Sequence, residues 1–333
     1  MKNNSRSKLL KTKPMPGDKD LFGGVIVPIL TFFDGKFNLD LKAQKRHTDF
    51  LIGNGVKSIF IMGSAGEGVC LCDEDKVELT EKSGEFIGGR ARMLAGISQE
   101  SLPRVKKLID KLKDFPIDAF VVTLPYYFPV SSHESVKDFF KAVADYSPKP
   151  IFVYNIPCFT KVNISPETVG ELSAYPNIVG VKDSHSDLAH LVKVIRSAKS
   201  ANPAFKVFIG EESIISSLYE EHFDGIIPIY GNIFPSVMVK LFNGISTRNP
   251  GDVVRMQAKL NDGKELIASA DSFYAALKAY LSIRGTCSPF VLPPIRTATR
   301  EQMILINEFY KKTEPASDEM GRASAYGGRN ANT

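Results

Sequence analysis

A lysine at the end of an apolar run is the residue of this 333-residue chain that most directly suggests chemistry. Lys182 follows the apolar residues 178–181, a run typical of a buried strand. Burial of an ammonium favours the neutral amine, which is the nucleophile that forms Schiff bases with carbonyl compounds. The structural alternative is a strand-end lysine whose charged head reaches solvent. Lys182 therefore indicates carbonyl chemistry if other polar groups gather around it.

Polar groups also stand at the ends of other apolar runs. A tyrosine near a lysine imine could move protons while a carbon–carbon bond breaks, because a protonated imine is a better electron sink than a ketone. A phenol is a poor base near neutral pH unless its anion is stabilised, so neighbouring hydroxyl groups would help it. A glycine-rich turn exposes backbone N–H groups that suit a carboxylate. The segments in question are Gly63-Ser64-Ala65-Gly66-Glu67, Pro125-Tyr126-Tyr127, Tyr154-Asn155-Ile156-Pro157, Gly210-Glu211-Glu212 and Gly231-Asn232.

The elements that must position these groups repeat along the chain as an apolar run followed by a helix-like segment, roughly every 25 to 30 residues. Most runs are continuously apolar, which is typical of parallel strands covered on both faces. Eight such units predict a (β/α)8 TIM barrel, in which the C-terminal ends of the strands converge on one mouth. A doubly wound open sheet is the alternative, but no Gly-rich dinucleotide turn follows the first run. The runs are 24–33, 56–63, 92–97, 119–124, 150–156, 178–182, 206–210 and 225–229.

Four segments are expected along the chain. Residues 1–20 carry six lysines and arginines against two aspartates, a net +4 of the formal +5, and are expected to be a disordered tail. The barrel is expected over 21–250. Helices in 251–313, over about 252–285 and 299–312 with a proline-rich stretch between them, should pack on the barrel as a C-terminal appendage. Residues 314–333 are expected to be a second disordered tail.

The sequence lacks the signals that are typical of several function classes. The part expected to fold is near neutral, so no nucleic-acid partner is expected. No apolar stretch reaches the length of a membrane span and no secretory signal is evident, so we expect no membrane contact and a cytoplasmic location. The five histidines lack metal-ligand spacing, and Cys70, Cys72, Cys158 and Cys287 form no zinc or disulfide pattern. We therefore expect neither a metal nor a separate cofactor.

The strand-end motifs, in their order and spacing, resemble the dihydrodipicolinate synthase and N-acetylneuraminate lyase superfamily of pyruvate-dependent class I aldolases. The likeness runs from about residue 23 to 310, and Gly180-Val181-Lys182-Asp183 belongs to it. It implies that Lys182 forms an imine with pyruvate and that Tyr154 shuttles protons above it. It further implies that Ser64 and Tyr127 relay protons to Tyr154, with Tyr127 reaching into the neighbouring subunit of a tight dimer. A homo-oligomer is expected, either that dimer or a tetramer built from two dimers.

Departures from the superfamily pattern bear on the substrate. Synthases have an arginine at the position of Phe159, and sialate lyases tend to have a serine at the position of Pro228. Ala65 replaces a hydroxyl residue, so a substrate carboxylate would depend on backbone N–H groups and on Ser64. The chain resembles most the 2-keto-3-deoxygluconate aldolase branch, whose products would be pyruvate and a short aldehyde such as glyceraldehyde.

Three further residues are expected to contact substrate: Glu211, Glu212 and Ile227. Carboxylates accept hydrogen bonds from sugar hydroxyl groups, although an acidic pair at a helix start is an equally good interpretation. Because two acids would disfavour a further negative charge and no arginine cluster stands at the strand ends, an unphosphorylated sugar acid is favoured. The alternatives are a dihydrodipicolinate synthase or N-acetylneuraminate lyase activity through the same imine, and a non-catalytic barrel that binds keto acids.

Overall fold

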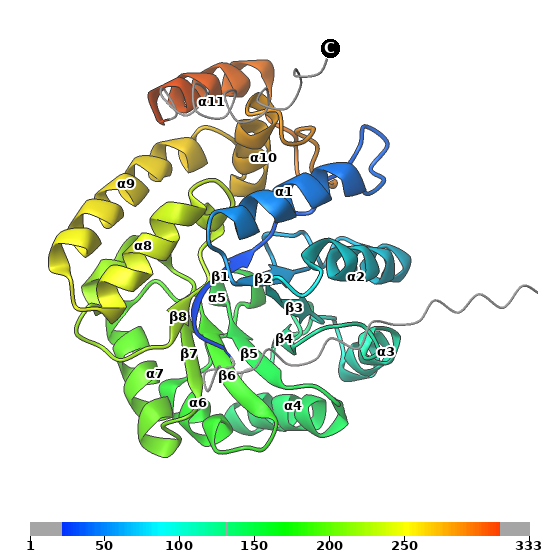
Figure 1. Ribbon diagram of the computed structural model, residues 1–333. Helices are drawn as coiled ribbons and strands as arrows, with labels where there is room; N and C mark the ends of the chain where they lie inside the picture. The colour runs from blue at the N-terminus through cyan, green and yellow to red at the C-terminus, as the bar shows by residue number, and fades with distance from the viewer. Residues whose placement is uncertain (1–21, 131, 314–333) are drawn as a thin grey trace, which may run out of the picture.

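The computed structural model describes residues 22–130 and 132–313, so the tails expected at 1–20 and 314–333 lie outside the described residues. Eight parallel strands close a barrel in chain order, with β8 hydrogen-bonded to β1 (Figure 1). The TIM barrel predicted from the apolar runs is confirmed. The strands are β1 (Gly24–Pro28), β2 (Ser58–Ile61), β3 (Arg92–Gly96), β4 (Ala119–Thr123), β5 (Ile151–Asn155), β6 (Ile178–Asp183), β7 (Lys206–Ile209) and β8 (Gly225–Ile226).

Helices lie around the outside of the barrel (Figure 1). The sequence signals of several starts are present: α2 begins at Asp73 with three acids in its first turn, and Ser165 caps α6 through the Thr168 N–H. The helices are α1 (Leu41–Gly53), α2 (Asp73–Ile87), α3 (Leu102–Leu112), α4 (His133–Tyr146), α5 (Pro157–Thr160), α6 (Pro166–Ser173), α7 (Leu188–Ala201), α8 (Pro235–Ser246), α9 (Pro250–Ala268), α10 (Phe273–Ile283) and α11 (Arg300–Thr313), with 3-10 turns η1 (Glu212–Leu218) and η2 (Ile229–Asn232).

Two buried layers account for the continuous apolar runs. One layer fills the barrel interior and includes Phe60, Phe152 and Phe208, which are at most 1% exposed. The other lies between the strands and the surrounding helices. A strand with a buried residue on each face has no polar face to show, which explains why alternation is missing from the sequence.

Several expected elements differ in extent from the prediction. The first run, expected over 24–33, contributes only Gly24–Pro28 to the sheet. The eighth run, expected over 225–229, contributes only Gly225–Ile226 to the sheet, because Pro228 cannot donate a ladder hydrogen bond and instead precedes η2. The helical stretch expected over 252–285 is two helices: α9 ends at Ala268, and Ser272 caps α10 by accepting from the Ala275 N–H. The four-residue link Ser269-Ala270-Asp271-Ser272 begins and ends with serine, and serine favours helix ends over helix interiors.

The last three helices, α9 to α11, pack at one side of the barrel (Figure 1). Tyr280 of α10 is fully buried, and its ring lies 6.1 Å from that of Phe309 on α11. Helix α9 packs against α8 and η1, next to the mouth of the barrel. Within the described residues, no helix is both long enough and apolar enough to cross a bilayer.

Candidate active site

Lys182 and Tyr154 lie side by side in the barrel interior. They are register partners on the neighbouring strands β6 and β5, and each side chain is 4% exposed. The Lys182 Nζ lies 4.0 Å from the centroid of the Tyr154 ring and 5.3 Å from that of Phe60. An amine held against a phenol ring within an apolar barrel is partly removed from water, as Schiff-base formation requires.

The next residue on each strand faces outward and ties the two strands together. The Asn155 amide donates to both carboxylate oxygens of Asp183 at 3.1 Å, and Asp183 pairs with His190 of α7 at 3.0 Å. Asn155 also accepts the Ile164 N–H at 3.1 Å. Asp183 is fully buried, so these contacts fix where the ends of β5 and β6 lie, and with them Lys182 and Tyr154.

Space for a substrate beside Lys182 depends on a glycine. A Cβ atom on Gly210, at the end of β7, would lie 3.1 Å from the Lys182 Cε and 2.2 Å from the Ser184 Oγ. The 2.2 Å approach is closer than real Cβ atoms come, and the 3.1 Å approach is tighter than most Cβ contacts, so a side chain at this position would displace its neighbours. Gly210 therefore leaves open the space that a carbonyl carbon bound to Lys182 would need.

The turn after β2 contributes Ser64 and Ala65, each with its backbone N–H group, to the lining of the same space. In the part of the chain that the structure describes, the N–H groups of Ser64 and Ala65 have no hydrogen-bond acceptor, whereas those of Gly66 and Glu67 donate to the Gly63 and Ser64 carbonyls, both at 3.1 Å. Two adjacent free N–H groups and a serine hydroxyl form a cradle for an anion. A carboxylate bound there would lie at the mouth of the barrel near Lys182.

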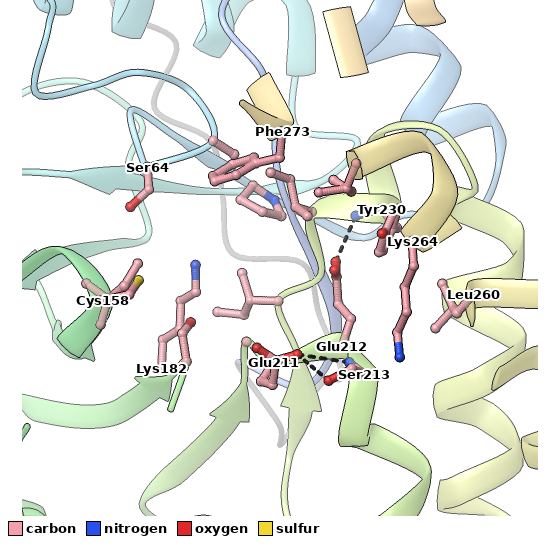
Figure 2. Close-up of a pocket in the computed structure, with 18 of the residues that line it drawn as sticks. Ser64, Cys158, Lys182, Glu211, Glu212, Ser213, Tyr230, Leu260, Lys264 and Phe273 are labelled. Atoms are coloured by element: carbon pink, nitrogen blue, oxygen red, sulfur yellow. Dashed lines mark hydrogen bonds between the residues drawn. The ribbon is translucent and has the colours of Figure 1, made fainter. Parts of the chain in front are cut away.

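A cavity of about 360 Å³ joins these groups, and Figure 2 shows Lys182 extending into it between Cys158 and Glu211. Of the residues expected to form the site, all but Tyr127 line this cavity. The lining includes Lys182, Tyr154, Ser64, Ala65, Glu211, Glu212 and Ile227, together with Ser184, Cys158 and Phe159.

Tyr127 lies outside the cavity of its own chain. It is 74% exposed, as is Phe128, and the two rings meet edge to face with centroids 4.9 Å apart. The sequence prediction had Tyr127 enter the site of a neighbouring subunit, and its exposure leaves it accessible to a partner. Its role in a relay stays a prediction.

Glu211 and Glu212 together carry less negative charge near neutral pH than two ordinary glutamates would. Glu212 Oε1 accepts the Tyr230 N–H at 2.8 Å, and burial, together with the neighbouring Glu211, raises the pKa of Glu212 to about 8. Glu211 Oε1 accepts from the N–H and hydroxyl of Ser213 at 3.1 and 2.6 Å. Near neutral pH the Glu212 carboxyl is therefore mostly protonated and can donate as well as accept a hydrogen bond.

Helices α9 and α10 supply cavity residues that the sequence reasoning missed. Gln257, Asn261 and Lys264 of α9 and Phe273 of α10 line the cavity. Figure 2 shows Lys264 beside Glu212. Gln257 also holds η1 by accepting the Ser216 N–H at 3.2 Å. The polar residues recur at helical spacing on one face of α9, which was a usable signal. The sequence could not say that this face meets the mouth of the barrel.

The cysteine at the cavity has no sign of a reactive thiolate. Burial raises the pKa of the Cys158 thiol, which disfavours the nucleophilic anion. In the described part of the chain, no three His, Cys, Asp or Glu side chains gather as metal ligands would. The Lys182 amine is therefore the nucleophile that the cavity geometry favours.

Known proteins are similar to this chain over most of its length. Residues 21–312 match the dihydrodipicolinate synthetase family. The chain is 28% identical over 282 residues to a probable 2-dehydro-3-deoxy-D-pentonate aldolase, YjhH, of Escherichia coli K12, covering 84% of this chain and 93% of that protein. It is 29% identical over 286 residues to 4-hydroxy-tetrahydrodipicolinate synthase 2 of Halalkalibacterium halodurans, covering 84% of this chain and 94% of that protein.

Solved structures agree with the sequence matches. The crystal structure of YagE, a prophage protein of the dihydrodipicolinic acid synthase family from E. coli K12 in complex with pyruvate, superposes with a TM-score of 0.84 at 26% identity. The match covers 89% of this chain and all of that chain. The barrel, the strand-end lysine and the match over nearly the whole described chain lead to one assignment: the protein belongs to the dihydrodipicolinate synthetase family and is a lyase of that family.

Proposed function

We propose that the protein is a Schiff-base aldolase for a 2-keto-3-deoxy sugar acid, such as 2-keto-3-deoxygluconate, which it cleaves to, or forms from, pyruvate and a short aldehyde such as glyceraldehyde. The observation that carries the proposal is the Lys182 amine, which lies 4.0 Å from the Tyr154 ring centroid at the cavity in the mouth of the barrel. The E. coli relative named for a 2-dehydro-3-deoxy-D-pentonate supports the sugar-acid class, and the pyruvate complex of YagE supports the keto acid.

The cleavage proceeds through Lys182. Its amine attacks the keto carbon of the sugar acid and water leaves, which forms a protonated imine. Tyr154 takes the proton of the C4 hydroxyl as the C3–C4 bond breaks, and the electron pair of that bond moves onto the imine to form an enamine. The aldehyde leaves, C3 takes up a proton, and water hydrolyses the imine to release pyruvate and free Lys182.

The rest of the cavity binds the two ends of the substrate. The substrate carboxylate lies on the Ser64 and Ala65 N–H groups and the Ser64 hydroxyl, by the same physics as other backbone anion sites. Glu211 and Glu212 bind hydroxyl groups of the sugar chain, and the protonated Glu212 is suited to do so without repelling them. Ile227 supplies an apolar contact at the cavity wall.

A homo-oligomer completes the site in this proposal. The exposed Tyr127 enters the cavity of a second copy and, together with Ser64 of that copy, relays protons to Tyr154 there. A dimer is the smallest assembly that allows this, and a tetramer of two such dimers is the larger alternative. The cytoplasmic location is kept as a prediction.

Two alternative activities would use the same lysine imine, and a third alternative is a barrel without catalysis. A dihydrodipicolinate synthase activity is favoured by the names of several relatives but disfavoured by Phe159, which is 45% exposed at the cavity where the synthases carry an arginine. The sialate lyase alternative is weakened by Pro228. A keto-acid-binding barrel without catalysis would need neither the Lys182 amine nor the Tyr154 hydroxyl at the cavity.

The first experiment is intact-protein mass spectrometry after incubation with pyruvate and borohydride. We expect the wild type to gain one reduced pyruvate adduct and Lys182→Ala to gain none, with loss of turnover. Lys264→Ala is the matched control, because Lys264 is another lysine of the same cavity and its loss should leave the adduct intact. No adduct on the wild type would remove the aldolase proposal in favour of the binding barrel.

The second experiment offers aldehydes to the pyruvate-loaded enzyme. Glyceraldehyde should be turned over with the highest kcat/KM, glyceraldehyde 3-phosphate with a lower one, and aspartate semialdehyde not at all. Exclusive use of aspartate semialdehyde would establish the synthase alternative instead. Preference for the phosphorylated aldehyde would keep the chemistry and contradict the unphosphorylated substrate.

A further inference from the structure

One residue of the strand-end motifs takes no part in the proposed chemistry. Glu67 follows the two free N–H groups by two residues, is 2% exposed and has a φ of 52°. Its carboxylate lies away from the cavity and pairs with Lys278 of α10, which is fully buried and 211 residues further along the chain. A charge pair so well hidden in an otherwise apolar region needs an explanation.

The pair joins three separate segments. Glu67 Oε1 accepts from Lys278, while Oε2 accepts the Leu292 N–H at 2.7 Å from the segment between α10 and α11. The Lys278 ammonium also donates to the Phe290 carbonyl at 3.0 Å and lies 4.3 Å from the centroid of the Phe33 ring. Because the partners of both charges come from distant parts of the chain, the turn after β2 is held by the C-terminal helices.

Stability alone is a weak reason for such a pair. Removing two charges from water costs so much that well-packed apolar residues often serve equally well at a buried position. Burial lowers the pKa of Lys278, and the Glu67 carboxylate opposes this shift. The pair does fix how Glu67 is oriented relative to α10, since charged hydrogen bonds allow only a narrow geometry.

The orientation of Glu67 affects the turn that carries the Ser64 and Ala65 N–H groups. The Glu67 N–H donates to the Ser64 carbonyl at 3.1 Å, so a displacement of Glu67 moves Ser64 with it. On the other side, the Thr31 hydroxyl donates to the Gly66 carbonyl at 2.7 Å. Helix α10 begins with Phe273, which lines the cavity, so the helix that anchors the turn also forms part of the wall above it.

We propose that Glu67 and Lys278 are positioning residues through which helix α10 holds the turn after β2 so that the Ser64 and Ala65 N–H groups meet the carboxylate of the keto acid. The proposal rests on the proposed function, because it takes that carboxylate to bind at Ser64 and Ala65. It gives the C-terminal helices a role in keto-acid affinity and not only in covering the barrel.

The test measures the pyruvate concentration that gives half-maximal borohydride trapping. Lys278→Met should raise it about tenfold, which corresponds to the loss of roughly one well-aimed hydrogen bond. Trapping of acetone, which has the carbonyl but no carboxylate, should stay within about twofold of the wild type. Lys199→Met is the matched control: it removes a part-buried ion pair with Asp224, 2.7 Å long, near the opposite end of the barrel, and should change neither value.

A second variant separates positioning from folding. Lys278→Met leaves Glu67 as an unpaired buried charge and can unfold the protein, whereas Glu67→Gln combined with Lys278→Met leaves no charge behind. The double variant should recover most of the thermal stability while its half-saturation for pyruvate stays raised. Recovery of both together, or an unchanged half-saturation in folded Lys278→Met, would overturn the proposal. Failure of the wild type to trap pyruvate would instead overturn the proposed function.

Discussion

At the scale of single residues, two side chains divide the proposed chemistry between them. Lys182 supplies the covalent bond and Tyr154 the proton transfer, so their variants should fail in different ways. Tyr154→Phe removes only the hydroxyl and keeps the ring against which the Lys182 amine lies. We expect the pyruvate adduct to form, with kcat for the carbon–carbon step lower by about two to four powers of ten.

Rapid-quench kinetics would measure both steps in the Tyr154→Phe variant. Phe60→Leu is a useful comparison, since it alters the more distant ring at 5.3 Å from the Lys182 amine and removes no proton donor. A fully active Tyr154→Phe would show that the proton moves by another route.

Glu212 should make stability depend on pH. Its pKa of about 8 in the folded protein lies above the ordinary 4.5, so the native state holds more protons than the unfolded state between these values. Its contribution is fully present below about pH 4.5 and is lost as the pH rises through 8. Urea unfolding should therefore show a free energy that falls over this window, by on the order of 1 to 3 kcal/mol after allowing for solvent at the cavity.

Glu212→Gln should flatten that dependence. Glu220→Gln, at a side chain 84% exposed, is the control for loss of a surface carboxylate and should leave the slope as in the wild type. An equally steep fall in Glu212→Gln would assign the slope to another group.

At the scale of elements, the loop after β4 is the segment that needs a partner for its proposed role. Tyr127 and Phe128 are both 74% exposed, and neither lines the cavity of its own chain. If Tyr127 acts across a dimer, mixing two impaired variants should restore activity. Heterodimers of Tyr127→Phe and Lys182→Ala contain one site with an intact lysine and an intact partner tyrosine.

Co-expression of the two variants should give about a quarter of wild-type activity, because half of randomly formed dimers carry one intact site. Analytical ultracentrifugation of the wild type should show a dimer or a tetramer. Activity no higher than the sum of the two separate variants would place Tyr127 outside the relay or within its own subunit.

At the scale of the whole molecule, the C-terminal helices behave as part of the barrel's core. Phe309 of α11 is 3% exposed and packs on Tyr280, within the cluster that includes the strands. Phe309→Ala should lower the free energy of unfolding by about 3 to 5 kcal/mol in a single denaturant transition. Ile304→Ala on the same helix, at a side chain 54% exposed, should change it by less than about 1 kcal/mol. A separate early transition would show that α9 to α11 unfold independently.

The fold and most of the cavity could be predicted because both depend on local patterns. Continuous apolar runs between helical segments indicate buried parallel strands, and eight of them close a barrel. The geometry of such a barrel brings the strand ends together, so Lys182, Tyr154 and Ser64 were expected to meet before any distance was known. The strand-end motifs then identified the family, which the comparisons confirm.

Only the tertiary structure decided what depends on contacts between distant elements. The pairing of Glu67 with Lys278 spans 211 residues, and no local pattern specifies it. The raised pKa of Glu212 comes mainly from its burial in the folded protein, and the packing of α9 against η1 brings Lys264 to the same cavity. Apolar periodicity determines which face of an element is buried, whereas the identity of the side chains that meet there depends on how the elements are placed in space.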